Sequence, residues 1–280
     1  GGEGPQPSGP RPYEEAVQEP VQPQPKAQDA HSSPPGPEPS SRPKTAPLPR
    51  DKEPVVQAGP RLAVVIDDLG QCLDKAEYLL AELGPDLTWS VLPHSAHTQE
   101  VVQLAADNGL EYLLHVPMEP LGYPEVDPGP GSLFVCMPAE AIRQALMQDL
   151  EQVPGAVGAN NHMGSRFTAD RSGMQVVLEE FKTRGLFFMD SLTSPQSTVA
   201  EVAREVGVPI TSRDIFLDNE QDVQAILHQL AKAERLARSV GQAVAIGHPY
   251  PETLTALSKW SKERDADVQL VRLSRLIVEQ

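Results

Sequence analysis

Carboxylate and imidazole side chains recur where an apolar run of the chain gives way to a loop. These groups move protons near neutral pH and bind divalent cations. If folding brings them together, they form a polar hydrolytic site. The residues concerned are Asp67, Asp68, His115, His162, Asp190, Asp214 and His248.

Asp67 and Asp68 end the first apolar run, LAVVID. Adjacent carboxylates point in different directions, so one can bind a cation while the other accepts a proton from a water that the cation has acidified. The alternative is that either aspartate caps the next helix or closes a turn.

His115 and His162 supply two imidazoles that, with one carboxylate, would suit zinc or a similar divalent cation with an open position. The alternatives are a hydrogen-bonded core histidine at 115 and a turn histidine at 162, within NNHMGS. Pro117 and Pro120 preclude a helix, so His115 and Glu119 are not a helical metal pair.

His248 lies between Gly247 and Pro249, where it could act as a general acid or simply begin a helix. His94 and His97 form a competing pair, which we interpret as the solvated start of a helix capped by Ser95. Asp218 and Asn219 are predicted to cap the long helix that follows them.

Short β-branched runs alternate with helical patterns from Arg61 onward, which indicates about seven or eight βα units around a parallel sheet. We predict a distorted (β/α) barrel, with an open doubly wound sheet as the alternative. In either fold the carboxyl ends of the strands share one face, where ligands bind. The loop from Pro117 to Gly131 is long enough to form a lid or rim there.

The first 60 residues hold 16 of the 29 prolines, mixed with small and polar residues. This composition predicts a disordered tail or linker, residues 1–60, ahead of one domain, residues 61–280. Because the chain begins Gly-Gly-Glu, we expect a signal or membrane anchor ahead of this tail. No apolar run approaches the roughly 18 to 20 residues that span a bilayer.

The formal net charge of −16 disfavours binding to nucleic acids and to anionic lipid. The two cysteines, Cys72 and Cys136, lack the spacing of a disulfide framework or a zinc ribbon, and we assign them no role. The sequence gives no indication of the oligomeric state.

The motifs AVVIDDLG, LLHVPMEP, NNHMGS, FMDS, RDIFLDN and GHPYPET together resemble the divergent polysaccharide deacetylase family, in the family's order. The resemblance covers almost all of residues 61–280. It implies a distorted (β/α) barrel of the carbohydrate esterase kind, usually exported to the periplasm of Gram-negative bacteria.

The resemblance also implies roles for individual residues. Asp67 matches the catalytic base, Asp68 a metal ligand and His115 the first histidine of the metal-binding pair. The second histidine is missing, and Glu119 stands four residues after His115. NNHMGS replaces the family's arginine-proline loop, so His162 is the candidate for the absent imidazole. His248 matches the general acid, which Asp190 or Asp214 is expected to orient, unless they bind substrate.

The leading hypothesis is therefore a metal-dependent hydrolase, with zinc as the first choice of cation, that deacetylates a cell-envelope glycan such as a peptidoglycan fragment. One alternative is a catalytically inactive glycan- or partner-binding module on the same barrel. The other is a different metal hydrolase on a similar barrel.

Overall fold

The computed structural model describes residues 59–277 of the protein. The predicted disordered tail lies outside the described residues, apart from Gly59 and Pro60. Among the helices of residues 59–277, none combines the length and the apolar character needed to cross a lipid bilayer.

A parallel sheet organises the described part of the chain, and its strands follow the order β6-β5-β4-β3-β2-β1-β8-β7, with β9 paired to β1. The parallel pairing confirms the α/β class expected from the alternating runs. The strands are β1 (Arg61–Leu69), β2 (Thr88–Val91), β3 (Glu111–Met118), β4 (Gly158–Met163), β5 (Phe187–Asp190), β6 (Ile210–Ser212), β7 (Ile215–Phe216), β8 (Gln242–Gly247) and β9 (Gln269–Leu270).

The sheet curls into a barrel with one open seam, between β6 and β7. These end strands are not paired with each other within residues 59–277, although only Arg213 and Asp214 separate them. The Arg213 amide donates to Asp190 O on β5, and the Asp214 amide donates to Val244 O on β8. The connection thus spans the seam, which confirms the distorted barrel rather than the doubly wound alternative.

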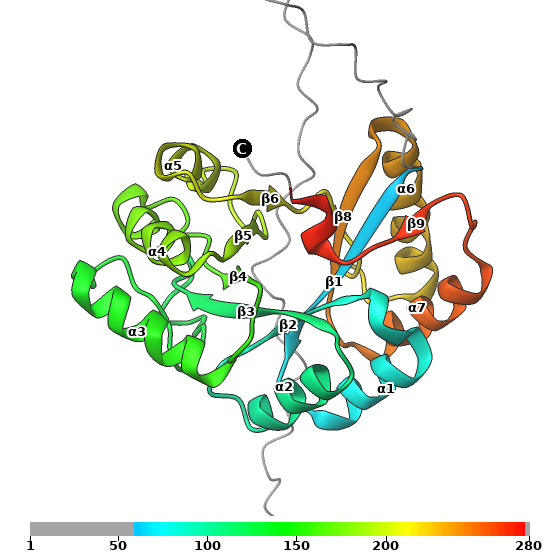
Figure 1. The fold of residues 1–280 in the computed structure, drawn as a ribbon, viewed down its shortest axis with the longest axis horizontal. Helices are drawn as coiled ribbons and strands as arrows, with labels where there is room; N and C mark the ends of the chain where they lie inside the picture. Colours follow the sequence, from blue (N-terminus) through cyan, green and yellow to red (C-terminus); the bar gives the residue numbers. More distant parts are fainter. Residues whose placement is uncertain (1–58, 278–280) are drawn as a thin grey trace, which may run out of the picture. The chain divides into compact units, whose positions relative to one another are not determined.

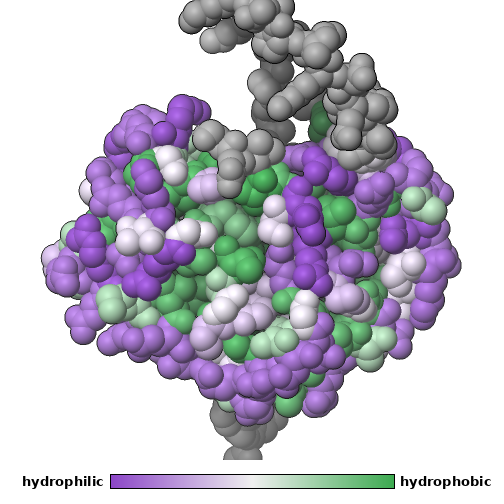
Figure 2. Space-filling model, in the orientation of Figure 1, coloured by the Kyte–Doolittle hydropathy of each residue, from purple (hydrophilic) through white to green (hydrophobic). Residues whose placement is uncertain are grey.

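Helices cover the outer side of the curled sheet, as Figure 1 shows. On the face drawn in Figure 2, hydrophilic residues gather at the periphery over these helices, and hydrophobic residues are visible nearer the middle. The helices are α1 (Leu73–Leu83), α2 (Thr98–Asp107), α3 (Ala139–Gln152), α4 (Arg171–Arg184), α5 (Val199–Val206), α6 (Val223–Val240) and α7 (Pro251–Glu263), with short 3₁₀ turns η1 (Gly84–Asp86) and η2 (Leu273–Leu276).

Alternate residues of β1 enter two separate cores, because successive side chains point to opposite faces of a sheet. On β1, Val64 and Ile66 belong to the outer core under the helices, whereas Ala63 and Val65 belong to the inner core. The inner core also contains Leu273 of η2. The C-terminal turn therefore fills the inside of the curled sheet near the amino ends of the strands.

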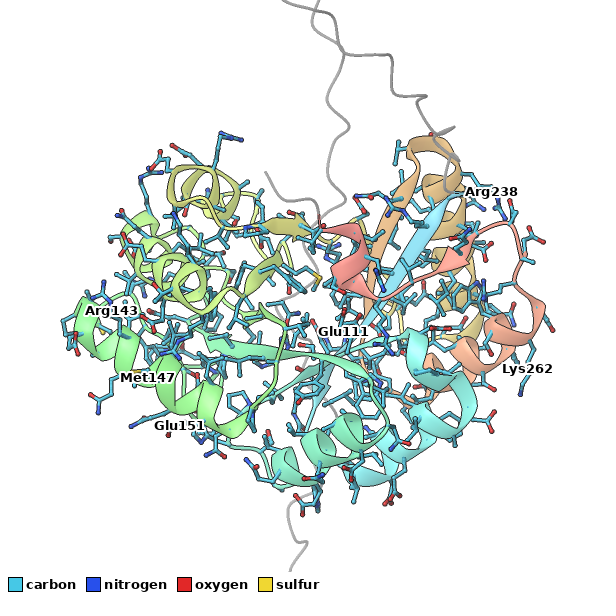
Figure 3. The ribbon with its side chains drawn as sticks, viewed as in Figure 1. Glu111, Arg143, Met147, Glu151, Arg238 and Lys262 are labelled. Carbon is cyan, nitrogen blue, oxygen red and sulfur yellow. The ribbon has the colours of Figure 1, made fainter. Side chains whose placement is uncertain are left out.

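Polar side chains fix this C-terminal turn. The Leu273 amide donates to Thr88 Oγ1 over 2.9 Å, and the Ser274 amide donates to Glu111 Oε1 over 3.0 Å. Glu111 is buried, and Figure 3 places it near the middle of the view. Because the amino end of the barrel is filled in this way, the carboxyl end is left for a functional site.

The long helix α6 begins differently from the prediction. Asp222, not Asp218, is its cap, and its Oδ1 accepts from the amides of Gln224 and Ala225. The prediction that Asp218 caps this helix is wrong, because Asp218 is buried beside His248.

Candidate metal centre

The inner face of the sheet changes character from the amino to the carboxyl ends of its strands. Val65, Leu113 and Ile246 are inner-core residues, and two positions further along each strand stand Asp67, His115 and His248. On β4, Asn160 pairs in register with His115, so Asn160 and His162 face the same way as His115. The strand periodicity therefore directs these side chains into one region.

Asp68 would face the helices in a regular strand, since it follows Asp67 directly. Its φ of 58° and the register shift between Ile66 and Leu69 break the alternation, and both carboxylates approach the same imidazole. Other non-glycine residues with positive φ lie near the carboxyl ends of β2, β4 and β5, namely His94, Met163 and Leu192. Backbone strain of this kind concentrates at functional sites.

Three side chains converge at the carboxyl end of the barrel. Asp68 Oδ1 lies 2.9 Å from His162 Nδ1 and 3.3 Å from His115 Nε2. The two ring nitrogens are 3.2 Å apart. One ligand atom from each residue lies within 4.8 Å of the others, and all three side chains are buried. The structure thus brings Asp68, His115 and His162 together, and their role as metal ligands stays a prediction.

The donor set of this cluster fits a divalent cation. Asp68 Oδ1 is buried and accepts no hydrogen bond from the described residues, although two ring nitrogens stand close to it. Burial would raise the pKa of Asp68, but the nearby rings of His162, His115 and His248 outweigh burial and hold this pKa well below its usual range. One carboxylate and two imidazoles that face a common point are the ligands of many catalytic zinc sites.

Asn160 is a buried residue that sequence reasoning did not select. Its Oδ1 lies 2.9 Å from His115 Nδ1 and accepts from Ser90 Oγ, while its Nδ2 donates to Asp67 Oδ1 over 2.9 Å. Because an amide oxygen only accepts, His115 carries its proton on Nδ1 and presents the Nε2 lone pair to the cluster. Asn160 thus positions both His115 and Asp67.

His248 is held by Asp218, a second partner that the sequence did not reveal. Asp218 Oδ1 lies 3.0 Å from His248 Nδ1, and its Oδ2 accepts from the His248 amide and from Thr253 Oγ1. The rings of Phe216 and Tyr250 lie near the imidazole, at centroid distances of 5.3 and 5.5 Å. The buried carboxylate therefore fixes the orientation of His248.

Asp218, rather than Asp190 or Asp214, is the carboxylate at His248 Nδ1, and a role for Asp190 or Asp214 in binding substrate stays a prediction. Asp190 follows the outer-core residue Phe188 by two positions and accepts from Ser197 Oγ and the Leu192 amide. Asp214 accepts from the amide of Val244. Burial raises the pKa of both carboxyls. Asp190 therefore holds the backbone that follows β5, and Asp214 holds the connection across the seam to β8.

Glu119 also lies outside the cluster and joins two loops. Its Oε2 accepts from the Val135 amide over 2.7 Å, and its Oε1 accepts from Arg166 Nη1 over 2.8 Å. Val135 lies in the loop after β3, and Arg166 lies in the loop after β4. Glu119 therefore supports the walls around the site rather than supplying a ligand atom.

Two hollows each have a residue of the cluster in their walls. The larger, of about 400 Å³, contains His162 in its wall together with the β2–α2 loop and the segment from Asp127 to Pro130. The smaller contains Asp68, His248 and Tyr250. Gln71 lines both hollows. The predicted lid segment, residues 117–131, therefore forms part of a wall beside the cluster.

His94 and His97 occupy different environments. His97 is partly exposed at the start of α2 and lies 3.5 Å from Glu100, as expected for a solvated helix start. His94 instead lines the larger hollow, and its Nε2 lies 2.9 Å from Oδ1 of the buried Asp149 on α3. His94 is exposed ahead of α2, but its carboxylate partner comes from a distant helix, which the sequence did not indicate.

Replacing Asp149 by asparagine is expected to change how stability depends on pH. Burial raises the pKa of Asp149 to about 8, against about 4 in an unfolded chain. The stabilisation from its retained proton is present below about pH 4 and is lost as the pH rises to about 8, by up to about 1.4 kcal/mol per pH unit.

Asp149→Asn cannot ionise, so its unfolding free energy should rise relative to the wild type across this window. Urea denaturation of both chains between about pH 4.5 and about pH 7.5 measures the difference. A constant difference across this range would show that Asp149 is ionised in the folded protein.

Comparison with known proteins identifies relatives of the whole described fold. The divergent polysaccharide deacetylase family matches residues 64–277. The chain is 35% identical over 219 residues to the uncharacterized protein YibQ of Escherichia coli, which covers 78% of this chain and 68% of that protein. It is 32% identical over 216 residues to an uncharacterized protein of Haemophilus influenzae, covering 77% and 76% of the two chains.

A solved structure agrees with these sequence matches. The crystal structure of an uncharacterized protein from Agrobacterium tumefaciens is 32% identical to this chain, with a TM-score of 0.75, and the match covers 78% of this chain and 89% of that one. The motifs, the barrel and the family match over residues 64–277 agree. This chain therefore belongs to the divergent polysaccharide deacetylase family.

Proposed function

We propose that the protein is a metal-dependent hydrolase of the carbohydrate esterase type that removes an acetyl group from an N- or O-acetylated glycan of the cell envelope. The observation that carries this proposal is the buried convergence of Asp68, His115 and His162 within 4.8 Å. We propose zinc as the cation and the periplasm as the compartment. Family membership supports a carbohydrate as the substrate.

Asp68, His115 and His162 would hold the cation, which would supply the Lewis acidity that polarises an acyl oxygen and acidifies a water. Asp67 stands beside this cluster, with Oδ2 at 3.7 Å from His115 Nε2 and Oδ1 fixed by the Asn160 amide. This position suits Asp67 to take the proton of an attacking water as the general base.

His248 is proposed to protonate the leaving amine or alcohol. It shares the wall of the smaller hollow with Asp68, so it faces the reacting group from the side of β8. The Asp218 carboxylate accepts from Nδ1, which leaves Nε2 to carry the proton that is transferred. Asp218 would also stabilise the imidazolium. In this proposal the base, Asp67, comes from β1, and the acid, His248, follows β8.

Replacing His248 by alanine is expected to flatten one limb of the pH profile of kcat, because a histidine acid titrates near neutral pH. The loss in kcat should reach about two orders of magnitude or more. Asp218→Asn should keep the limb but shift it, since the amide no longer stabilises the charged ring. An unchanged profile in His248→Ala would assign the proton transfer to another group.

The experiment that tests the proposal is acetate release by the zinc-loaded full chain. The substrates are N-acetylglucosamine oligomers, peptidoglycan glycan fragments and O-acetylated glycans, with the deacetylated product confirmed by mass spectrometry. Release of acetate that requires Asp67 supports the hydrolase. Binding of glycan and zinc without any release would favour the inactive binding module.

A further inference from the structure

His94 and the buried Asp149 form a pair that the proposed chemistry does not use. His94 Nε2 faces Asp149 Oδ1 at 2.9 Å, while its other ring nitrogen, Nδ1, has no partner among residues 59–277. The His94 side chain is 29% exposed, whereas that of Asp149 is fully buried. Asp149 thus holds the imidazole at Nε2, and the rest of the ring is accessible.

Asp149 occupies an unusual position for a carboxylate. The buried residues of α3 include Ile142 and Leu146, and Asp149 continues the same inward stripe at helical spacing. Figure 3 shows Arg143, Met147 and Glu151, also on α3, toward the outer side of the molecule. Asp149 Oδ2 is buried and finds no hydrogen bond within the described part of the chain. Burying a carboxyl group with an unpaired oxygen costs folding free energy, so its retention calls for an explanation. Its contact with His94 offers one.

The surrounding backbone is built closely around this pair. His94 adopts a φ of 55°, which few non-glycine residues do. A side chain at Gly131 would meet Asp149 Oδ1 and the His94 ring. The β2–α2 loop and the loop after β3 therefore both position the imidazole.

The hollow that His94 lines adjoins the candidate metal centre, because His162 belongs to both. Its volume of about 400 Å³ lies within the range of small-molecule sites. The second hollow, beside Asp68 and His248, is much smaller, at about 50 Å³. The larger hollow therefore has room beside the reacting centre for a sugar unit next to the acetylated one.

We propose that His94 is a specificity-determining residue that binds the sugar unit next to the acetylated one, and that Asp149 is its positioning residue. The substrate is then an acetylated oligosaccharide of at least two units. With Nε2 bonded to Asp149, Nδ1 is the ring nitrogen left to form a hydrogen bond with a hydroxyl or amide group of the neighbouring sugar. This inference rests on the proposed function, because it takes the ligand to be a saccharide.

The test compares binding of an N-acetylglucosamine tetramer with that of the monomer, by calorimetry on the zinc-loaded full chain. His94→Asn keeps a residue that tolerates positive φ but removes the imidazole. We expect it to weaken tetramer binding about three- to tenfold, the cost of one neutral hydrogen bond, and to leave monomer binding unchanged. His97→Asn changes a partly exposed histidine that does not line the hollow and is the matched control.

Variants of Asp149 separate positioning from folding. Asp149→Ala should weaken tetramer binding as His94→Asn does, while Asp149→Asn should restore it because the amide oxygen still accepts from Nε2. In the deacetylation assay both His94→Asn and Asp149→Ala should raise KM for the tetramer and leave kcat within about twofold.

Equal losses for monomer and tetramer, wild-type affinity in His94→Asn, or no tetramer binding to the wild type would each overturn this inference. Its failure is distinguishable from that of the proposed function. Binding that depends on His94 without acetate release would retain the subsite and reject hydrolysis. Acetate release with an unchanged KM in His94→Asn would retain hydrolysis and reject the subsite.

Discussion

Asp67→Asn is expected to bind zinc as the wild type does and to lose about two to four orders of magnitude in kcat, the usual contribution of a general base. Asp67 lies beside the cluster, but the set of converging ligand atoms comes from Asp68, His115 and His162. The asparagine keeps the size of the side chain and removes its capacity to take a proton. Steady-state acetate release, together with zinc content by elemental analysis, measures both effects.

Two further variants bracket this result. Asp68→Asn changes the adjacent carboxylate and should lose the metal as well as the activity. Asp74→Asn changes an exposed aspartate on α1 and should alter neither. Loss of zinc from Asp67→Asn would place Asp67 among the ligands, and undiminished kcat would assign the base to another residue.

His162→Ala is expected to lose its zinc during dialysis, because it removes one of three protein ligands. The loss in affinity should exceed the roughly 10- to 100-fold cost of losing an outer-shell partner. Zinc should also raise the Tm of the wild type more than that of the variant, since a cation that binds only the folded state stabilises it.

His97→Ala is the matched control for His162→Ala, because His97 is partly exposed and lies outside the cluster. It should retain zinc and its effect on Tm. Full zinc occupancy in His162→Ala, with the fold intact by circular dichroism, would mean that the cation is held without this imidazole.

The convergence of the three side chains of the candidate metal centre could be predicted from sequence because it follows from topology. Parallel strands place their carboxyl ends on one face, and Asp68, His115 and His162 each lie toward the end of a different strand. The direction of the Asp68 side chain could not be predicted, because it depends on a left-handed backbone that places this side chain on the same side as Asp67. Both faces of the strands are buried, so alternation is invisible in the sequence.

The residues that hold the reactive groups were harder to predict. Asp218 looked like a helix cap because it precedes α6, and only the fold brings it to His248. Asn160 lies inside a buried strand, where an amide is rare enough to signal a hydrogen-bonding role. Asp149 interrupts an apolar helical stripe, a signal that periodicity could have revealed. In each case the partner is remote in sequence.

The central claim is that one divalent cation, held by Asp68, His115 and His162, supports deacetylation. The most direct test is to strip the full chain of metal with a chelator and titrate zinc back while acetate release from the N-acetylglucosamine tetramer is followed. We predict that stripped protein is inactive and that the rate rises linearly and saturates at one zinc per chain. Acetate release that persists without metal, or a chain saturated with zinc that releases none, would contradict the account.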